Sequence, residues 1–187
     1  MARLILALFA TTLWVGQVAA QVVVDKAKEA EALAAQGKYI EAINALDDAT
    51  AALWDRSPLV FRRALWVAEP PGGFGVFNPR ENNVYAPGAA MIAYAEPIGF
   101  GWRRSGEIWR LDMAIDIVIK SAQGKILAER TDFQKLQLAS RVRNREFMAR
   151  VTYTFTGIPA GDYVLDTTLR DNVTGKKGTY TLSFVIK

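Results

Sequence analysis

The chain has 187 residues, no cysteine and no histidine, and a formal net charge of +4. It therefore cannot form a disulfide, a Ser-His-Asp or Cys-His catalytic site, or an ordinary zinc or copper site. The length is enough for one domain with a sizeable core and a small appendage, and the slight basic excess suits solubility better than nucleic-acid binding. We expect no metal and no cofactor.

The first twenty residues have the layout of a secretory signal. A positive start at Arg3 is followed by an apolar run over residues 4–15, and then by an exit segment in which Val18 and Ala20 are spaced as a signal-peptidase site. The run is shorter than the roughly 20 apolar residues that a spanning helix needs. We expect cleavage after Ala20 and a periplasmic or secreted bacterial protein without a stable membrane span. A retained anchor is the alternative.

Residues 21–57 are expected to form a helical hairpin, with the two helices lying within residues 25–54. Gly37 interrupts the helical spacing and suits a left-handed C-terminal cap, while Pro58 cannot continue the second helix. The residues that the second helix places on one face are Ile40, Ile43, Leu46, Ala49, Ala52 and Leu53.

The hairpin resembles a single tetratricopeptide unit. In that family small residues let two helices approach closely, and aromatic and aliphatic residues fill the gap between them. No second copy follows, and a solenoid needs about three repeats to bury its faces. The hairpin is therefore expected to dock on its own domain or on another protein. The positions that carry the resemblance are Ala30, Leu33, Gly37, Tyr39, Ala42, Leu46 and Ala49, with Pro58 beyond the end.

From residue 58 onward the apolar pattern changes from a period of 3.6 to a period of 2. The clearest strand covers residues 111–120, and the turn that follows contains Gly124. We count seven or eight strands and no helix between them, which predicts an antiparallel β-sandwich over residues 58–187 and a mainly β fold class. The other expected strands cover residues 59–68, 89–96, 126–130, 147–155, 163–170 and 179–186.

Residues 158–165 resemble the entry to a late strand of immunoglobulin-like and fibronectin-like domains. In those domains a Tyr after a Pro-Gly turn bonds back to the backbone across the corner, and Tyr163 stands in that position after Pro159 and Gly161. Residues 85–88 resemble a similar entry to an early strand in secreted bacterial sandwich domains. The resemblance implies an immunoglobulin-like architecture and no particular activity, because such sandwiches mostly bind, space or assemble.

The loop from residue 96 to residue 104 is the first candidate binding surface. Aromatic side chains beside arginines in a glycine-containing loop are typical of recognition surfaces. The loop over residues 72–80 has similar chemistry and would join it if both lie at one end of the sandwich. Alternatively, the aromatic side chains cap the core and the arginines are solvated. The predicted binding residues are Glu96, Phe100, Trp102, Arg103, Arg104 and Arg80.

A stripe of arginines is the second candidate. Arg141, Arg143 and Arg145 fall on one face of an extended segment, with Lys135 and Arg150 nearby in the sequence. Such a stripe would suit acidic glycans or anionic lipid head groups. The alternative is a charged edge strand that prevents aggregation.

A carboxylate pair is the third candidate. Asp112 and Asp116, with Glu107 nearby, would lie about 13 Å apart on one strand face. That spacing exceeds the separation of about 5–9.5 Å between glycosidase carboxylates, so a solvent-facing role is favoured.

Together these patterns favour a non-enzymatic, exported binding or assembly module whose partner is an envelope protein or glycan. One alternative is a cell-envelope hydrolase that uses carboxylates or a Ser-Lys pair. Another is a subunit that docks on a partner through its helical hairpin.

Overall fold

The computed structural model describes the backbone of residues 10–187 and the side chains from Gln21 onward. The chain divides into a helical unit that ends at Ser57 and a strand unit, Pro58–Lys187. The predicted signal, residues 1–20, lies outside the residues whose side chains are described, and its cleavage stays a prediction. Within residues 10–187, no helix combines the length and the apolar character that a membrane crossing requires.

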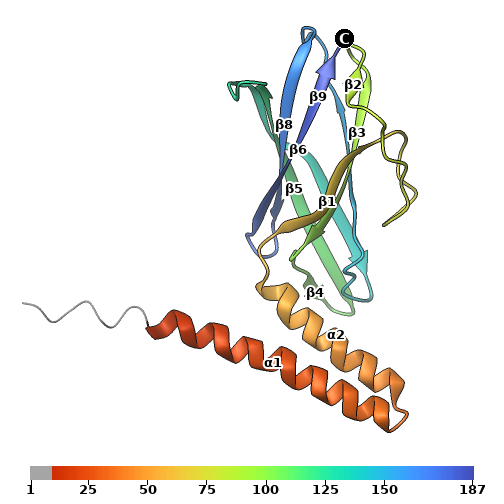
Figure 1. The fold of residues 1–187 in the computed structure, drawn as a ribbon, viewed down its shortest axis with the longest axis vertical. Helices are drawn as coiled ribbons and strands as arrows, with labels where there is room; N and C mark the ends of the chain where they lie inside the picture. The colour runs from red at the N-terminus through yellow and green to blue at the C-terminus, as the bar shows by residue number, and fades with distance from the viewer. Residues whose placement is uncertain (1–9) are drawn as a thin grey trace, which may run out of the picture. The chain divides into compact units, whose positions relative to one another are not determined.

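The helical unit is a hairpin of α1 (Ala10–Ala35) and α2 (Tyr39–Arg56) (Figure 1). The first helix begins earlier than the predicted residue 25, because no Pro or other helix-breaking signal separates it from the preceding segment. Gly37 has a φ of +75° and ends α1 as expected. Its N–H donates to the Ala34 carbonyl at 2.9 Å, and the Lys38 N–H donates to Leu33 at 3.0 Å.

Small residues make the contact between the two helices. Ala30 of α1 packs against Ala42 and Ala45 of α2, which agrees with the tetratricopeptide-like pattern. The predicted apolar face of α2 is only partly correct, since Ala49 is buried whereas the larger side chains on that face are not. They face solvent because the alanines already fill the narrow gap between the helices. The exposed fractions are 75% for Ile40, 59% for Ile43, 49% for Leu46 and 56% for Leu53.

The strand unit is a β-sandwich of two sheets, so the predicted mainly β class is confirmed (Figure 1). The smaller sheet has the order β1-β3-β7 and contains β1 (Val60–Val67), β3 (Ala90–Ile98) and β7 (Ala149–Thr154). The larger sheet has the order β2-β9-β8-β5-β4, with β6 also paired to β5, and contains β2 (Val84–Tyr85), β4 (Arg103–Ser105), β5 (Ile108–Ser121), β6 (Ile126–Ser140), β8 (Gly161–Asp171) and β9 (Lys177–Ile186).

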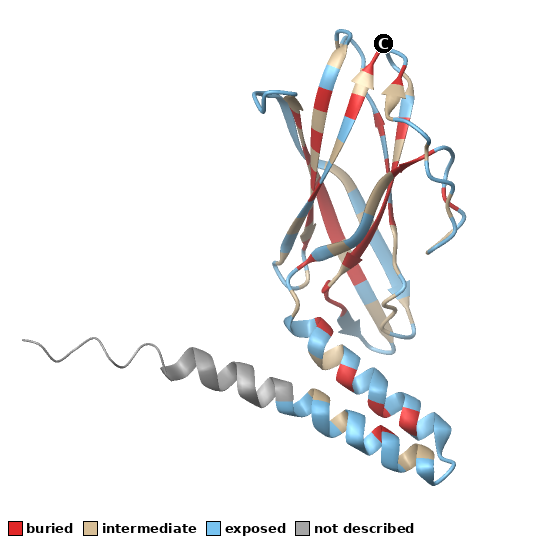
Figure 2. Ribbon diagram, in the orientation of Figure 1, coloured by how far each residue is buried: buried red, intermediate tan, exposed pale blue. Residues whose placement is uncertain are grey.

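The strands differ from the prediction in number and in length. The described residues form nine strands, because β2 and β4 are too short to show an alternating pattern. The pairing of β2 with β9 is parallel, against the antiparallel expectation. Strand β6 reaches Ser140 instead of residue 130, since most of its side chains are exposed and hide the pattern (Figure 2). A bulge beside Asp132, whose φ is +51°, interrupts it further.

The core lies between the two sheets and contains a buried network of hydroxyl groups. Leu111, Met113 and Ile115 of β5 alternate inward and are at most 1% exposed. The Tyr153 hydroxyl lies 2.8 Å from the Thr167 hydroxyl and 2.9 Å from that of Tyr180. Because each of these buried hydroxyls has a partner, the network adds specificity without an unsatisfied polar group.

The predicted tyrosine corner is present. The Tyr163 hydroxyl donates to the Pro159 carbonyl at 2.8 Å, and Tyr163 is 8% exposed. This bond fixes the turn that leads into β8, as the resemblance to immunoglobulin-like domains implied.

Candidate functional site: an arginine cluster

Two segments that the sequence analysis treated separately meet at one end of the sandwich. The Trp102 indole N–H donates to the Asn144 carbonyl at 3.1 Å. The Phe100 ring packs edge-on against Phe147, with the ring centroids 5.6 Å apart. These contacts join the loop before β4 to the loop between β6 and β7, so arginines from both loops lie at one end of the sandwich.

Strands β4 and β5 place two arginines directly opposite each other. Arg103 is the antiparallel partner of Arg110, and both side chains are exposed. Like charges opposite each other on paired strands are destabilising. Among the described residues, no carboxylate forms an ion pair with either arginine. The two charges therefore share one face of the hairpin without an ion-pair partner in the described part of the chain.

A tryptophan holds two further guanidinium groups on the opposite face of the same β4–β5 hairpin, because successive side chains of a strand alternate between its faces. Arg104 is the strand partner of Trp109, and its guanidinium carbon lies 5.8 Å from the centre of the indole ring. The guanidinium of Arg143, from the β6–β7 loop, lies 5.5 Å from the same ring. Cation–π contacts at such distances are worth about 0.5–1 kcal/mol at exposed sites. The ring therefore orients both groups without neutralising either charge.

A fifth arginine, Arg141, completes the surface. It pairs with Glu107 at 3.3 Å, but both side chains are more than three-quarters exposed. Solvent screens such a pair, so it contributes little to stability and a stronger anion would displace it. Arg103 and Arg110 lie on one face of the β4–β5 hairpin, and Arg104, Arg143 and Trp109 lie on the other. We name the group formed by Arg103, Arg104, Arg110, Arg141, Arg143 and Trp109 at this end of the sandwich the arginine cluster.

The loop that leads into β4 is anchored by a residue that the sequence analysis did not select. The Asp171 carboxylate accepts the Gly101 N–H at 2.7 Å and the Val173 N–H at 2.9 Å, and it also accepts from Thr174. It is 1% exposed. A Cβ atom on Gly101 would lie 2.3 Å from a Thr174 methyl group, so glycine is required there. The sequence feature that could have identified Asp171 is an aspartate at the first position of the turn that ends at Gly175.

Three of the six predicted binding residues are buried and do not present their side chains to a partner. Phe100 and Trp102 are 0% and 9% exposed, and Glu96, at 6%, accepts a 2.8 Å hydrogen bond from the Tyr94 hydroxyl. For Phe100 and Trp102 the alternative interpretation applies, because large aromatic groups at the base of a loop gain more from burial than from exposure. Phe100 and Trp102 support the arginine cluster through their contacts with Phe147 and Asn144. Arg103 and Arg104 remain on the surface.

Arg80 does not join the cluster. Its guanidinium donates to the Val84 carbonyl at 2.9 Å and lies over the Tyr85 ring at 4.4 Å. Its backbone N–H donates to Trp66, near one end of the β1–β3 ladder, whereas β4 follows Ile98 at the other end. Within the described residues, the loop over residues 72–80 reaches the other loop only through Tyr94, whose hydroxyl accepts the Gly75 N–H at 2.7 Å and donates to Glu96, and this contact brings no arginine of the loop to the cluster.

The carboxylate pair belongs to a polar network on the outer face of the larger sheet. Burial opposes ionisation of Asp116, but hydrogen bonds from the Arg170 guanidinium and the Asp132 N–H outweigh it and hold the pKa of Asp116 below its ordinary value. Asp112 accepts side-chain hydrogen bonds from Gln137 and Asn172. A carboxylate that is held ionised in this way is poorly suited to donate a proton as a general acid. Within the described residues, no three metal-binding side chains gather into a candidate metal site.

Comparison with known proteins gives no family. No protein-family model matches the chain, and no curated protein is similar to it. Among solved structures, the C-terminal domain of Wzt has a TM-score of 0.38 and 11% identity over 72% of this chain and 76% of its own. A CARDB domain from Pyrococcus furiosus, in complex with di-metal ions, has a TM-score of 0.31 and 12% identity over 70% and 95%. Similarity this low says nothing of what this chain binds.

Proposed function

We propose that this chain is an exported, non-catalytic binding or assembly module of the bacterial cell envelope, and that the arginine cluster is its contact surface for an anionic partner. The observation that carries the proposal is the exposed pair Arg103 and Arg110, opposite each other on β4 and β5. An anion between the two guanidinium groups would remove their repulsion, so the surface gains more from binding than isolated arginines would.

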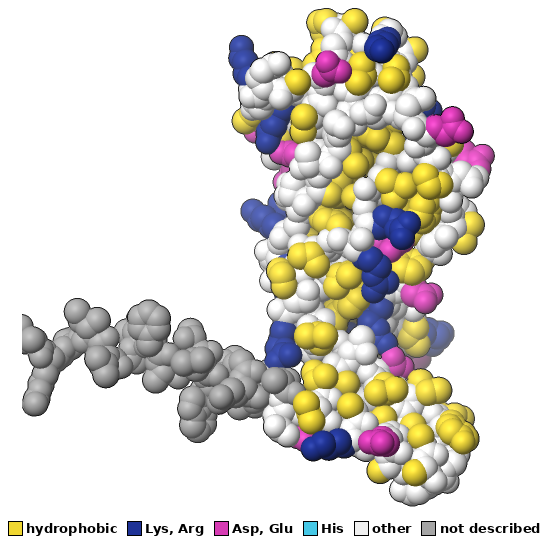
Figure 3. Space-filling model, in the orientation of Figure 1, with side chains coloured by type: hydrophobic (Ala, Val, Ile, Leu, Met, Phe, Trp, Pro, Cys, Tyr) yellow, Lys and Arg dark blue, Asp and Glu magenta, His cyan; other side chains and the backbone are white. Residues whose placement is uncertain are grey.

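The chemistry of the arginine cluster suits carboxylates and phosphates. Guanidinium groups recognise both through paired hydrogen bonds, and arginine is favoured at interfaces for that reason. The half-buried Trp109 ring adds an apolar face between charged groups. Basic side chains also outnumber acidic ones in the strand unit as a whole, and dark blue side chains are distributed along its visible face in Figure 3. The expected partner is an acidic glycan or an acidic protein surface of the envelope.

Site-specific photo-crosslinking in cells tests the proposal. A photoreactive amino acid at Ser105, in the exposed β4 strand, should give a covalent adduct in the envelope fraction. The same group at Asn82, in the loop near β2, is the matched control. The adduct should disappear when Arg103→Gln and Arg110→Gln are combined. Equal adducts at both positions, or an adduct that survives the double variant, would contradict the assignment.

Export has its own test. N-terminal sequencing of the protein from the periplasmic or secreted fraction should begin at Gln21, as the layout of the first twenty residues predicts. A mature chain that still begins at Met1 would contradict the export part of the proposal.

A second candidate function is docking on a partner protein through the hairpin. It is favoured by the exposed apolar face of α2, where Ile40 and Ile43 are 75% and 59% exposed. Apolar side chains gather on the visible surface of the helical unit (Figure 3). The variant Ile43→Lys should then lose the envelope partner while the arginine double variant keeps it, and the opposite pattern would favour the arginine cluster.

A further inference from the structure

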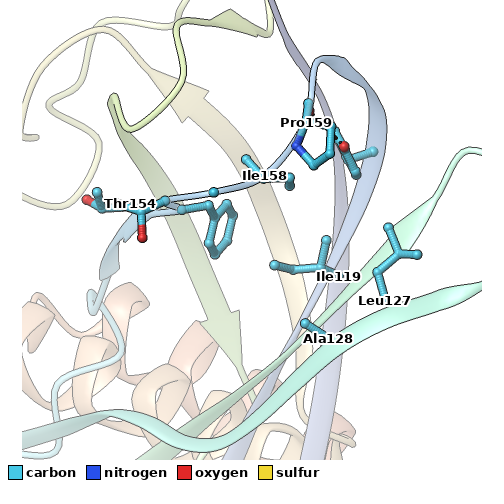
Figure 4. Close-up of a pocket in the computed structure, with 10 residues that line it drawn as sticks. Ile119, Leu127, Ala128, Thr154, Ile158 and Pro159 are labelled. Atoms are coloured by element: carbon cyan, nitrogen blue, oxygen red, sulfur yellow. Dashed lines mark hydrogen bonds between the residues drawn. The ribbon is translucent and has the colours of Figure 1, made fainter.

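A groove lies on the open side of the sandwich, away from the arginine cluster. It has a volume of about 640 Å³ and is bordered by β5, β6 and the segment that follows β7. A second hollow of about 250 Å³ shares Ile119, Ala128 and Phe155 with it, so the two are continuous. Figure 4 shows Thr154 and Ile158 on one side of the groove and Ile119, Leu127 and Ala128 on the other. The walls are mostly apolar.

The same groove is bordered by an unpaired strand edge. Within residues 10–187, strand β7 pairs with β3 alone. The Arg150 carbonyl accepts the Gln134 side chain at 3.1 Å, so it points away from β3. Backbone groups alternate sides along a strand, so those of Thr152 and Thr154 point the same way. Among the described residues, no backbone hydrogen bond reaches either one.

The smaller sheet therefore ends at β7 and leaves part of the larger sheet without a facing strand. Strand β6 extends the larger sheet on this side, and Ile126 and Leu127 at its start are 51% and 49% exposed. We propose that an extended segment of a partner polypeptide adds to β7 as a fourth strand and places alternate apolar side chains in the groove. Main-chain hydrogen bonds to the edge would give affinity, and the groove would select the side chains.

Two observations select the chemistry of that segment. Glu129 and Arg130 line the groove and balance each other, and Asp132 of β6 is paired with Arg170. Lys125, at the start of the β6 side, and Arg150 of β7 then leave a basic excess on the bordering segments. The segment is therefore expected to carry acidic residues at its ends. A fatty acyl chain would fill the apolar walls equally well, but it would leave the N–H and C=O groups of the β7 edge without partners.

Peptide binding to the full mature chain tests the proposal. The probes are labelled ten-residue peptides in which Thr alternates with Val, Ile, Leu or Phe and both ends carry either Asp or Lys. At least one Asp-ended peptide should bind saturably and more tightly than its Lys-ended counterpart. On binding, amide hydrogen exchange should slow at Thr152 and Thr154.

A matched pair of variants isolates the backbone contribution. Thr154→Pro removes the N–H that faces the groove and keeps the β3–β7 ladder, whereas Thr154→Ala keeps that N–H. We expect the Kd to rise at least tenfold for the proline variant and to stay within twofold for the alanine variant. Thermal unfolding of each variant is the check that both remain folded. The exchange measurement uses the wild-type chain and is independent of the two variants.

Three results would overturn strand addition: no saturable binding by any peptide, equal binding by both variants, or binding without protection of the two amides. Displacement of the peptide by palmitate with no protected amides would assign the groove to an apolar ligand instead. None of these results bears on the arginine cluster, because the groove lies by the β5–β6 turn and the cluster lies at the opposite end of β5.

Discussion

The loop that supports the arginine cluster depends on one buried carboxylate, and Asp171→Asn measures that dependence. The substitution keeps the size of the side chain but replaces one acceptor oxygen by an NH₂ donor. If the NH₂ group faces Gly101, the Gly101 N–H loses its acceptor. If it faces the other way, the N–H groups of Val173 and Thr174 lose theirs. The first orientation leaves a buried donor unpaired, and the second leaves two part-buried donors unpaired.

The magnitude follows from these bonds. A hydrogen bond to a charged group is worth about 1.5–3 kcal/mol, and an unsatisfied buried donor costs about 1–3 kcal/mol. We expect the free energy of unfolding to fall by about 2–4 kcal/mol. For a domain of this size that corresponds to a drop in Tm of roughly 8–16 °C.

Thermal unfolding followed by circular dichroism is the assay. Asp162→Asn is the matched control, since it removes the same charge from the exposed start of β8 and should change stability by no more than about 0.5 kcal/mol. A small surface substitution of about 0.5 kcal/mol changes the Tm by roughly 2 °C. If the Tm of Asp171→Asn differs from that of the wild-type chain by no more than this, the carboxylate does not anchor the loop.

Three further predictions concern the core. Tyr163→Phe loses the 2.8 Å hydrogen bond of the corner and should cost about 1 kcal/mol in urea unfolding, and an unchanged midpoint would show that the hydroxyl is solvated. Burial raises the pKa of Tyr180 to about 12, so the folded state holds this proton more tightly than the unfolded state. That stabilisation is complete below pH 10 and falls by about 3 kcal/mol as the pH rises from 10 to 12. Tyr180→Phe should lack this contribution and keep the losses that come from Tyr153 and Tyr85, whose pKa values burial also raises. Gly178→Ala would place a Cβ 2.2 Å from the Leu59 carbonyl oxygen and should cost about 3 kcal/mol, whereas Gly73→Ala meets nothing within 4 Å and should be nearly neutral by the same chemical unfolding.

The sandwich could be predicted because its central strand has a clear pattern. Leu111, Met113 and Ile115 alternate with polar residues, and burial on one face of a sheet produces that alternation directly. The full length of β6 could not be predicted, because side chains that face water on both sides of a strand leave no periodic signal. The short β4 strand is defined by its pairing with β5, which is a non-local contact.

Individual arginines of the site could be predicted from the sequence, but their proximity in the fold could not. Arg103, Arg104 and Arg143 were all selected from local composition. Their convergence depends on the β4–β5 register and on the contact of Arg143 with Trp109. Whether Phe100 faces solvent or the core depends in turn on Phe147, a partner distant in the sequence.

The most direct test of the central claim is the affinity of the arginine cluster for defined polyanions. The mature chain would be titrated with polygalacturonate, inorganic polyphosphate and polyglutamate by isothermal titration calorimetry. At least one should bind, and Arg103→Gln combined with Arg110→Gln should weaken that binding at least tenfold, since each charge-assisted contact is worth about 1.5–3 kcal/mol. Lys125→Gln combined with Lys187→Gln removes the same net charge at the opposite end of β5 and should leave the affinity within about twofold, because screened charges that far from the ligand act weakly. Binding by none of the three polyanions, or equal weakening by the two double variants, would contradict the account.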